Sequence, residues 1–215
     1  ERPDEHCLVT TIEKDGKKIK CYYHKVLEAK LILHDDIVIS LDTDFIENES
    51  ADVSKQDCEL NAAKRLIERI KENYPKLNIC IQGDALYAVE PFMKLCRGFG
   101  WKYLFTEKTD RHKIIMEFYD YIKNGGGCDE ISDICEEKDT GRYSNGVEKT
   151  AGKEEAANIF EYEYSEKDEN GEVVKNIVFT WVTNIDITKK ILPEMIIAGR
   201  GRWKIENEGF NNQKM

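Results

Sequence analysis

The spacing of apolar residues changes along this chain from strand-like to helix-like, and this change restricts the folds open to it. Residues 7–12, 20–33 and 36–46 alternate or run as apolar segments between turn residues, which predicts three strands. Asp15 and Gly16 predict a hairpin turn between the first two strands. Beyond them, Ser54 and Asp57 resemble a capping box, and apolar residues recur at helical spacing until Pro75. The sequence therefore predicts an antiparallel meander followed by a helix.

The next segments alternate strand and helix signals. The apolar run LNICIQGDALYA predicts a buried strand that ends at Gly83 and Asp84. Pro91 suits the first turn of a helix, which Gly98 ends, and WKYLFT at 101–106 predicts a further strand. The resulting order, β-β-β-α-β-α-β, is that of a ribonuclease H-like α/β fold with a mixed sheet. That fold places carboxylates at strand ends around divalent metals.

The second half of the chain departs from this alternation. Residues 110–123 predict a helix, and residues 128–156 are polar and interrupted by glycines, which predicts a mobile excursion. Asn170 and Gly171 predict the turn of a hairpin formed by residues 159–164 and 173–183. Thr188 is expected to cap a final helix. We therefore predict a first part of the core at 1–109, a β-containing insertion at 110–187, and a C-terminal catalytic helix at 188–215 that completes the core.

Composition narrows the class of protein. Of the 215 residues 40% are hydrophobic, which is enough for a core, and no apolar stretch approaches the ~20 residues of a membrane span. The net charge of −10 argues against a protein that coats nucleic acid. Residues 189–214 nevertheless hold six Lys or Arg against three Glu, so this region is locally positive. Seven cysteines without a CxxC pair, among them Cys58, Cys80 and Cys96 in apolar segments, predict buried reduced thiols and a cytoplasmic protein.

Two acidic residues are candidate ligands for a metal. Asp84 follows a buried strand, at the end of the sheet where sites form in open α/β proteins, and it either holds the loop or binds metal. In the final helix, Glu206 shares a face with Arg202, Trp203 and Phe210. A Glu on this partly apolar face requires a partner. Arg202 is one candidate, and a metal shared with Asp84 is the other.

Two stretches carry a resemblance to a known family. The C-terminal stretch VTNIDITKK…AGRGRWKIENEGFNNQK is similar to the C-terminal signature of bacterial insertion-sequence transposases of the DDE type, and ICIQGDALYA resembles the strand of their second Asp. Arg202 and Glu206 match the Arg and the catalytic Glu of the family's Tyr-Arg-Glu-Lys motif. The Tyr position falls on Gly199, and the Lys position falls one residue before Lys214.

The resemblance implies a DNA transposase that cleaves and transfers strands at transposon ends. Asp84 and Glu206 would be catalytic residues and ligands of Mg²⁺, with Mn²⁺ as a substitute, because hard carboxylate oxygens suit these ions. Arg202, Trp203 and Lys214 would contact DNA. The expected partners are double-stranded DNA, as transposon ends and target, and a second copy in a homodimer when full-length. The expected location is the bacterial cytoplasm with the nucleoid, and no membrane is involved.

The family requires one more Asp, and the sequence leaves its place open. Residue 1 is Glu rather than Met, so we expect the chain to be an excised piece whose first catalytic Asp lies upstream. Asp42 is the alternative. A truncated, inactive fragment that keeps the fold and at most binds DNA is a competing interpretation. A ribonuclease H-like nuclease without strand transfer is a third, which the β-containing insertion disfavours.

Overall fold

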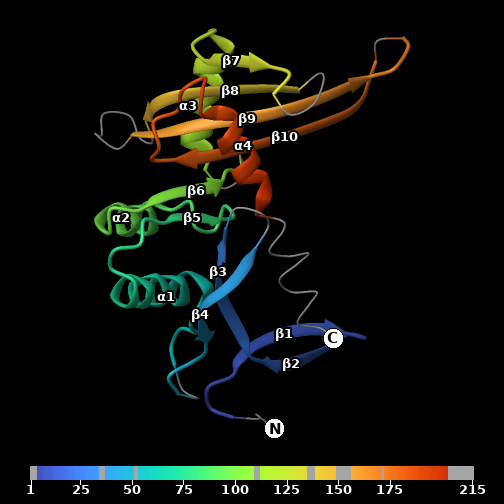
Figure 1. Ribbon diagram of the computed structural model, residues 1–215. Coiled ribbons are helices and arrows are strands. Elements are labelled where there is room, and N and C mark those ends of the chain that lie inside the picture. Colours follow the sequence, from blue (N-terminus) through green and yellow to red (C-terminus); the bar gives the residue numbers. More distant parts are fainter. Residues whose placement is uncertain are drawn as a thin grey trace. The chain divides into compact units, whose positions relative to one another are not determined.

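The computed structural model describes residues 4–33, 37–50, 53–108, 112–134, 139–148, 156–170 and 172–202. Within these residues the protein is a mixed α/β structure with four helices and a six-stranded mixed sheet, which confirms the predicted class (Figure 1). Four strands rather than three precede the first helix, so the ribonuclease H-like order is not confirmed. The chain divides into two compact units, Glu1–Leu77 and Asn78–Met215.

The first unit begins with the predicted hairpin. Strands β1 (Leu8–Lys14) and β2 (Lys17–Tyr23) pair antiparallel along their whole length. Asp15 and Gly16 between them have φ values of 52° and 70°. A two-residue hairpin turn of type I′ requires positive φ at both central positions, which Asp and Gly tolerate. The hairpin predicted from these two residues is confirmed.

A second two-stranded sheet follows, and it corrects the expected meander. Strands β3 (Lys25–Ile32) and β4 (Val38–Ile46) pair with each other and not with the β1–β2 hairpin. The predicted single strand at 20–33 is wrong, because the chain breaks between β2 and β3 at His24. The Nε2 atom of His24 lies 2.9 Å from Oδ2 of Asp4. The sequence has no Gly, Pro or Asn at this break. The contact that accompanies the break joins residues distant in sequence, so no local pattern could predict it.

Helix α1 (Glu59–Asn73) buries its apolar face within the first unit. It ends before Pro75, as predicted. The predicted capping box at Ser54 is wrong, since the helix begins at Glu59 and its N-cap residue Cys58 forms no side-chain cap. Asp57 instead forms an ion pair with Arg65, at 2.8 Å. The buried residues of the helix are Ala62, Ala63, Leu66, Ile67 and Ile70.

The second unit is built on the six-stranded sheet. In spatial order its strands are β5 (Cys80–Gly83), β6 (Lys102–Thr106), β10 (Val173–Thr183), β9 (Ala156–Lys167), β8 (Asp139–Glu148) and β7 (Asp129–Ser132). Strands β5 and β6 are parallel, and the other pairings among the described strands are antiparallel. The predicted strands before Asp84 and at 101–106 and the predicted β9–β10 hairpin are confirmed. Strands on both sides of residue 109 therefore belong to one sheet.

The polar region at 128–156 was expected to be an excursion, and its described part contradicts this. It holds β7 and β8, and β8 pairs with β9 for most of its length. Tyr143 and Val147 of β8 are buried. Gly141 lies against the side chains of Ile134, Leu192 and Ile196, where a Cβ atom would collide with them. These strands form because tertiary contacts cover them, which local composition does not reveal.

Helices cover both faces of this sheet (Figure 1). Helix α2 (Glu90–Gly98) packs Phe92 against Phe105, and helix α3 (Lys113–Asn124) pairs Lys123 with Glu161 at 2.6 Å. Helix α4 (Leu192–Gly201) packs on the opposite face, in a core cluster with Leu104, Tyr143, Phe160, Tyr162 and Trp181. The predicted Thr188 cap is wrong, because Ile191 is the N-cap of α4. No helix in the described ranges is long and apolar enough to cross a membrane.

The cysteines differ from the expectation of buried thiols. Cys96 is buried, whereas Cys58 and Cys80 are exposed. The cysteines among the described residues are all free. Cys96 lies on α2 in the helical pattern that predicted its burial, while Cys58 precedes α1 and Cys80 begins the edge strand β5.

Candidate functional site

Asp84 lies directly after β5, at the carboxyl end of this strand, where the sequence placed it. Its Oδ1 atom accepts a hydrogen bond of 2.8 Å from the backbone N–H of Leu86. Its carbonyl oxygen accepts another, of 3.1 Å, from the N–H of Tyr87. This is the Asx-type turn that Asp favours at strand ends. The residue is exposed, and Oδ2 makes no hydrogen bond or ion pair within the described ranges. Oδ1 therefore holds the loop, while Oδ2 takes no part in the turn.

The sheet register places Asp84 close to two residues that are distant in sequence. Gly83 pairs with Phe105 in the parallel register, so Asp84 follows level with Thr106. Thr106 in turn pairs with Trp181 of β10. Neighbouring strands lie about 4.8 Å apart, so roughly 10 Å separate the backbones at Asp84 and Trp181. These residues stand in a row across one end of the sheet.

Helix α4 meets this row at Trp181. A Cβ atom at Gly199 would lie 2.6 Å from Cε2 and 2.8 Å from Nε1 of the Trp181 indole. Such distances are far inside van der Waals contact, so the helix approaches the sheet this closely because residue 199 has no side chain. By the resemblance described for the sequence, position 199 would correspond to the Tyr of the motif, and here the Trp181 ring occupies the space that a larger side chain would require.

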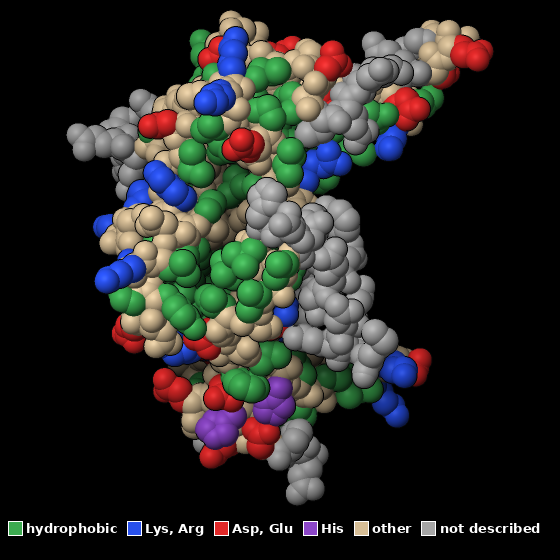
Figure 2. Space-filling model, viewed as in Figure 1, with side chains coloured by type: hydrophobic (Ala, Val, Ile, Leu, Met, Phe, Trp, Pro, Cys, Tyr) green, Lys and Arg blue, Asp and Glu red, His purple; other side chains and the backbone are tan. Residues whose placement is uncertain are grey.

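Beyond Gly199 the surface is hollowed. A depression of about 740 Å³ lies among α4, β9, β10 and the end of β6. Figure 2 shows Lys and Arg side chains beside the β9–β10 hairpin on the viewed face. Among the residues that line the depression, one is acidic, Glu107, and four are basic. The basic ones are Lys108, Lys175, Arg200 and Arg202. In a chain with a net charge of −10, this is a local concentration of positive charge.

Glu107, the single acidic residue that lines the depression, contacts His112. The side chain of Glu107 is 1% exposed, and its Oε2 atom lies 2.7 Å from Nδ1 of His112. The Glu107 backbone N–H donates to the carbonyl oxygen of Thr180 at 2.8 Å, which fixes the end of β6 to β10. No local sequence pattern predicts this pair, because an E-x-x-x-x-H spacing matches no helical or strand period. The contact with His112 gives the buried Glu107 side chain a polar partner.

Two of the basic residues lie over tyrosine rings. The guanidinium of Arg200 is 4.9 Å from the ring centre of Tyr162, and its Nη1 donates to the Tyr162 hydroxyl at 3.3 Å. The ammonium of Lys175 is 5.2 Å from the ring centre of Tyr164. Tyr162 and Tyr164 are two apart on β9 and so point to the same face. Cations from α4 and β10 thus alternate with aromatic rings along one wall.

The other predicted site residues divide into two groups. Arg202 is the C-cap of α4 and lines the depression, so it lies in the same region as Trp181. Trp203, Glu206 and Lys214 lie outside the described residues, and their expected roles stay predictions.

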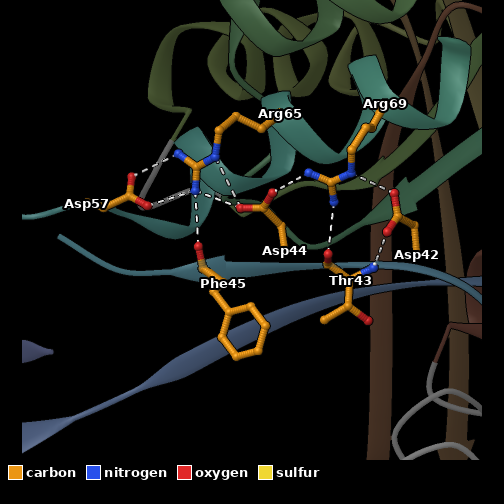
Figure 3. Close-up of polar contacts among 7 residues, drawn as sticks. All are labelled: Asp42, Thr43, Asp44, Phe45, Asp57, Arg65 and Arg69. Atoms are coloured by element: carbon orange, nitrogen blue, oxygen red, sulfur yellow. Dashed lines mark hydrogen bonds and ion pairs between the residues drawn. The ribbon is translucent and has the colours of Figure 1, made fainter. Parts of the chain in front are cut away.

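The alternative first acid, Asp42, lies on β4 in the first unit and is fully engaged there (Figure 3). Its Oδ2 accepts a 2.9 Å hydrogen bond from Nε of Arg69, and its Oδ1 accepts one of 2.7 Å from the Thr43 N–H. The hydrogen bond from Arg69 holds the pKa of Asp42 below its ordinary value, with a further contribution from Thr43. Both oxygens are engaged, so the geometry favours a structural role for Asp42.

Asp42 belongs to a network that joins α1 to β4 (Figure 3). Arg65 contacts Asp44 and Asp57, and Arg69 contacts Asp42 and Asp44. Apart from Asp42, the charged residues of the network line an open depression of about 1210 Å³ in the first unit. Its opposite charges compensate one another, which is the arrangement expected of a structural clamp.

The described residues contain no group of three or more His, Cys, Asp and Glu side chains placed to hold a metal ion. No known protein family matches the chain, and no curated protein matches it. Function is therefore proposed from the contacts described above together with the sequence motifs.

Proposed function

We propose that this protein is the catalytic domain of a DDE transposase, which cleaves and transfers DNA strands at transposon ends in a metal-dependent reaction on a ribonuclease H-like core. The observation that supports this most is the row Asp84, Thr106 and Trp181 across the sheet, with Gly199 of α4 packed on Trp181. This row supports the proposal because helix α4, which precedes Glu206 in the chain, packs on β10, two strands away from β5.

The proposal requires Glu206 to reach Asp84. It follows Arg202 by four residues, and four residues span at most about 14 Å. Arg202 ends α4 on the depression next to Trp181. A chain continuing from Arg202 can therefore bring a second carboxylate to the strand end where Asp84 lies.

The residues suit Mg²⁺, or Mn²⁺ in its place. These ions take oxygen ligands, and Asp84 is an exposed carboxylate with one oxygen outside the local turn. Asp84 and Glu206 would hold the ion, which when bound would activate an attacking oxygen and stabilise a leaving one. The positive depression supports a polyanionic partner, here the transposon end and target DNA, with Arg202, Trp203 and Lys214 as contacts. A homodimer on paired ends is part of the proposal for the full-length protein.

A second candidate is a fragment that binds DNA without catalysis. It is favoured by two observations, the engagement of both Asp42 oxygens and the presence of Gly199 at the motif's Tyr position. Under this alternative the depression still binds DNA, whereas Asp84 serves only the turn before Leu86.

Calorimetric titration with Mn²⁺, together with a nicking assay on supercoiled DNA, tests the proposal. The variants are Asp84→Asn and Glu206→Gln, and Asp120→Asn is the control, since Asp120 is an exposed acid on α3 away from the row. We expect each site variant to weaken Mn²⁺ binding at least about tenfold, which is the loss of roughly 1.4 kcal/mol. Equal Mn²⁺ affinity in all four proteins would contradict the proposal. DNA binding without Mn²⁺ binding would favour the second candidate.

A further inference from the structure

Gln82, which lies two residues before Asp84 on β5, carries a buried oxygen atom without a partner. Its Oε1 atom is shielded from solvent and accepts no hydrogen bond. Buried polar atoms of folded proteins nearly always have a hydrogen-bond partner, because an unsatisfied acceptor destabilises the fold. This oxygen therefore points to a ligand that the chain itself does not supply.

The Gln82 side chain lies on the face of the sheet that α4 covers. Gln82 pairs with Leu104 in the parallel register of β5 and β6, and side chains at paired positions share a face. Leu104 belongs to the core cluster to which α4 contributes. Residues 82 and 84 are two apart, so the alternation of strand side chains places Asp84 on this face as well. Gln82 and Asp84 thus present two oxygen-bearing side chains on one face, about 6.6 Å apart along the strand.

The end of β5 is held in place from the opposite face. The Tyr87 ring lies against Gly83, where an added Cβ atom would be 2.5 Å from Cδ2 of that ring. Tyr87 also contacts Phe105 of β6, with ring centres 6.3 Å apart. The Tyr87 N–H donates to the Asp84 carbonyl oxygen at 3.1 Å, which closes the turn. The backbone from Gln82 to Asp84 is therefore fixed before any ligand binds, which is what a binding site requires of its supporting residues.

We infer that Gln82 is a ligand of the divalent cation, to which it supplies its amide oxygen beside the carboxylate of Asp84. This inference rests on the proposed function and adds to it a neutral ligand outside the acids of the motif. Mg²⁺ and Mn²⁺ take oxygen ligands, and carbonyl oxygens are among those that suit them. Oδ2 of Asp84 and Oε1 of Gln82 accept hydrogen bonds and do not donate them. They cannot satisfy each other, whereas a cation satisfies both.

A neutral ligand suits an ion that must also attract a phosphate. A carboxylate at position 82 would hold the ion more tightly, because the affinity of such sites rises with the charge of their ligands. It would also cancel more of the positive charge that attracts the DNA phosphate. An amide oxygen fills a coordination position without that loss. Gln82→Glu should therefore separate the two properties, with tighter binding of the cation and weaker binding of DNA.

Calorimetric titration of the whole chain with Mn²⁺, together with melting curves with and without Mn²⁺, tests the inference. Gln82→Met keeps the length of the side chain and removes the oxygen, so it should bind Mn²⁺ about tenfold more weakly. Without Mn²⁺ it should melt at or above the wild-type temperature, because an unsatisfied buried acceptor is gone.

Gln82→Glu should change the same quantities in the opposite direction. We expect it to bind Mn²⁺ about tenfold more tightly than wild type, and Mn²⁺ should raise its melting temperature by more. With Mn²⁺ present, fluorescence anisotropy should show weaker binding of a DNA duplex to this variant than to wild type. Tyr119→Phe, which removes a buried hydroxyl on α3, is the control and should bind Mn²⁺ as wild type does.

Four results would overturn the inference. Wild-type Mn²⁺ affinity in Gln82→Met, beside a weakened Asp84→Asn, would remove Gln82 from the site and leave the proposed function standing. A lower melting temperature of Gln82→Met at unchanged Mn²⁺ affinity would give Gln82 a structural role, with a bound water as the partner of its oxygen. Equal or weaker Mn²⁺ binding by Gln82→Glu would contradict coordination by residue 82. Failure of the wild type to bind Mn²⁺ would count against the proposed function, and against this inference with it.

Discussion

Asp44 lies between two guanidinium groups of one helix. Its Oδ1 atom is 2.6 Å from Nη2 of Arg65, and its Oδ2 atom is 2.7 Å from Nη1 of Arg69. Arg65 and Arg69 are four residues apart on α1, so they project from the same face in successive turns. The Asp44 side chain is 8% exposed. One nearly buried carboxylate therefore connects β4 to two turns of α1.

Asp44→Asn is expected to destabilise the protein by about 1–3 kcal/mol, because it removes the charge that two guanidinium groups share in a sheltered position. Urea unfolding of the first unit, followed by circular dichroism, measures this loss. Glu13→Gln on the exposed β1–β2 hairpin is the control and should stay within ~0.5 kcal/mol. An Asn variant as stable as that control would show that the clamp has no net stabilising effect.

Acid should weaken the same clamp. The hydrogen bond from Arg69 lowers the pKa of Asp42 below the ordinary value of 3.8. A carboxyl whose folded-state pKa is depressed stabilises the fold above its unfolded pKa, and this contribution is lost as the pH falls through the folded value. Urea midpoints measured from pH 6 to pH 2 should therefore decline below about pH 4. Arg69→Gln should flatten that decline, and an identical decline in both proteins would contradict this cause.

Gly199→Ala should destabilise the second unit by about 1–3 kcal/mol, because the new Cβ would overlap the Trp181 indole. Trp181→Leu removes that obstacle. In the double variant the cost of the Ala should fall, with a coupling of at least ~0.5 kcal/mol in a double-mutant cycle measured by chemical unfolding. If the two substitutions destabilised the protein by strictly additive amounts, helix α4 would have shifted in Gly199→Ala, and the new Cβ atom would not contact the Trp181 indole.

Asp84→Asn should leave stability within ~0.5 kcal/mol of wild type, because Asn also accepts the hydrogen bond from the Leu86 N–H. Asp84→Ala removes that acceptor and should cost about 1 kcal/mol. Thermal unfolding of the three proteins separates the two effects. Any loss of metal binding in the Asn variant then reflects the carboxylate and not the turn. A large loss of stability in Asp84→Asn would make that variant unfit for the metal test.

Cys96 should resist thiol reagents that modify Cys58. Burial raises the pKa of the Cys96 thiol to about 12, whereas Cys58 is exposed. The thiolate is the reactive form, so at pH 8 the reagent should label Cys58 first and Cys96 only after unfolding. Mass spectrometry of partially labelled peptides in native buffer and in urea checks this order. Equal labelling in native buffer would contradict the burial of Cys96.

The sequence predicts those elements whose signals are local. Asp15 and Gly16 have the conformations that their turn requires, and Pro91 and Pro75 stand at helix boundaries. Strands β7 and β8 were missed because polar residues form them. Their stability comes from their pairing with each other, from the pairing of β8 with β9, and from cover by α4. The break at His24 depends on its contact with Asp4, which no local pattern contains.

The position of Asp84 was predictable from the sequence, whereas the surroundings of the candidate site were not. Asp84 was expected at a strand end and lies there, since an apolar run that ends in Gly-Asp is a local signal. The close approach of Gly199 to Trp181 depends on how a helix packs on a sheet. The burial of Glu107 against His112 likewise depends on where α3 begins. Such relations between distant residues follow from tertiary packing.

The position of β10 between β6 and β9 also determines when the site can form during synthesis. Strand β6 is made early and gains its antiparallel neighbour only when β10, near the end of the second unit, has left the ribosome. Helix α4, which brings Gly199 to Trp181, emerges later still. Pairing between strands so distant in sequence is slow, and the unfinished β5–β6 pair is exposed until then. Nascent chains arrested before β10 should therefore lack the row at Asp84 and be the species on which chaperones act.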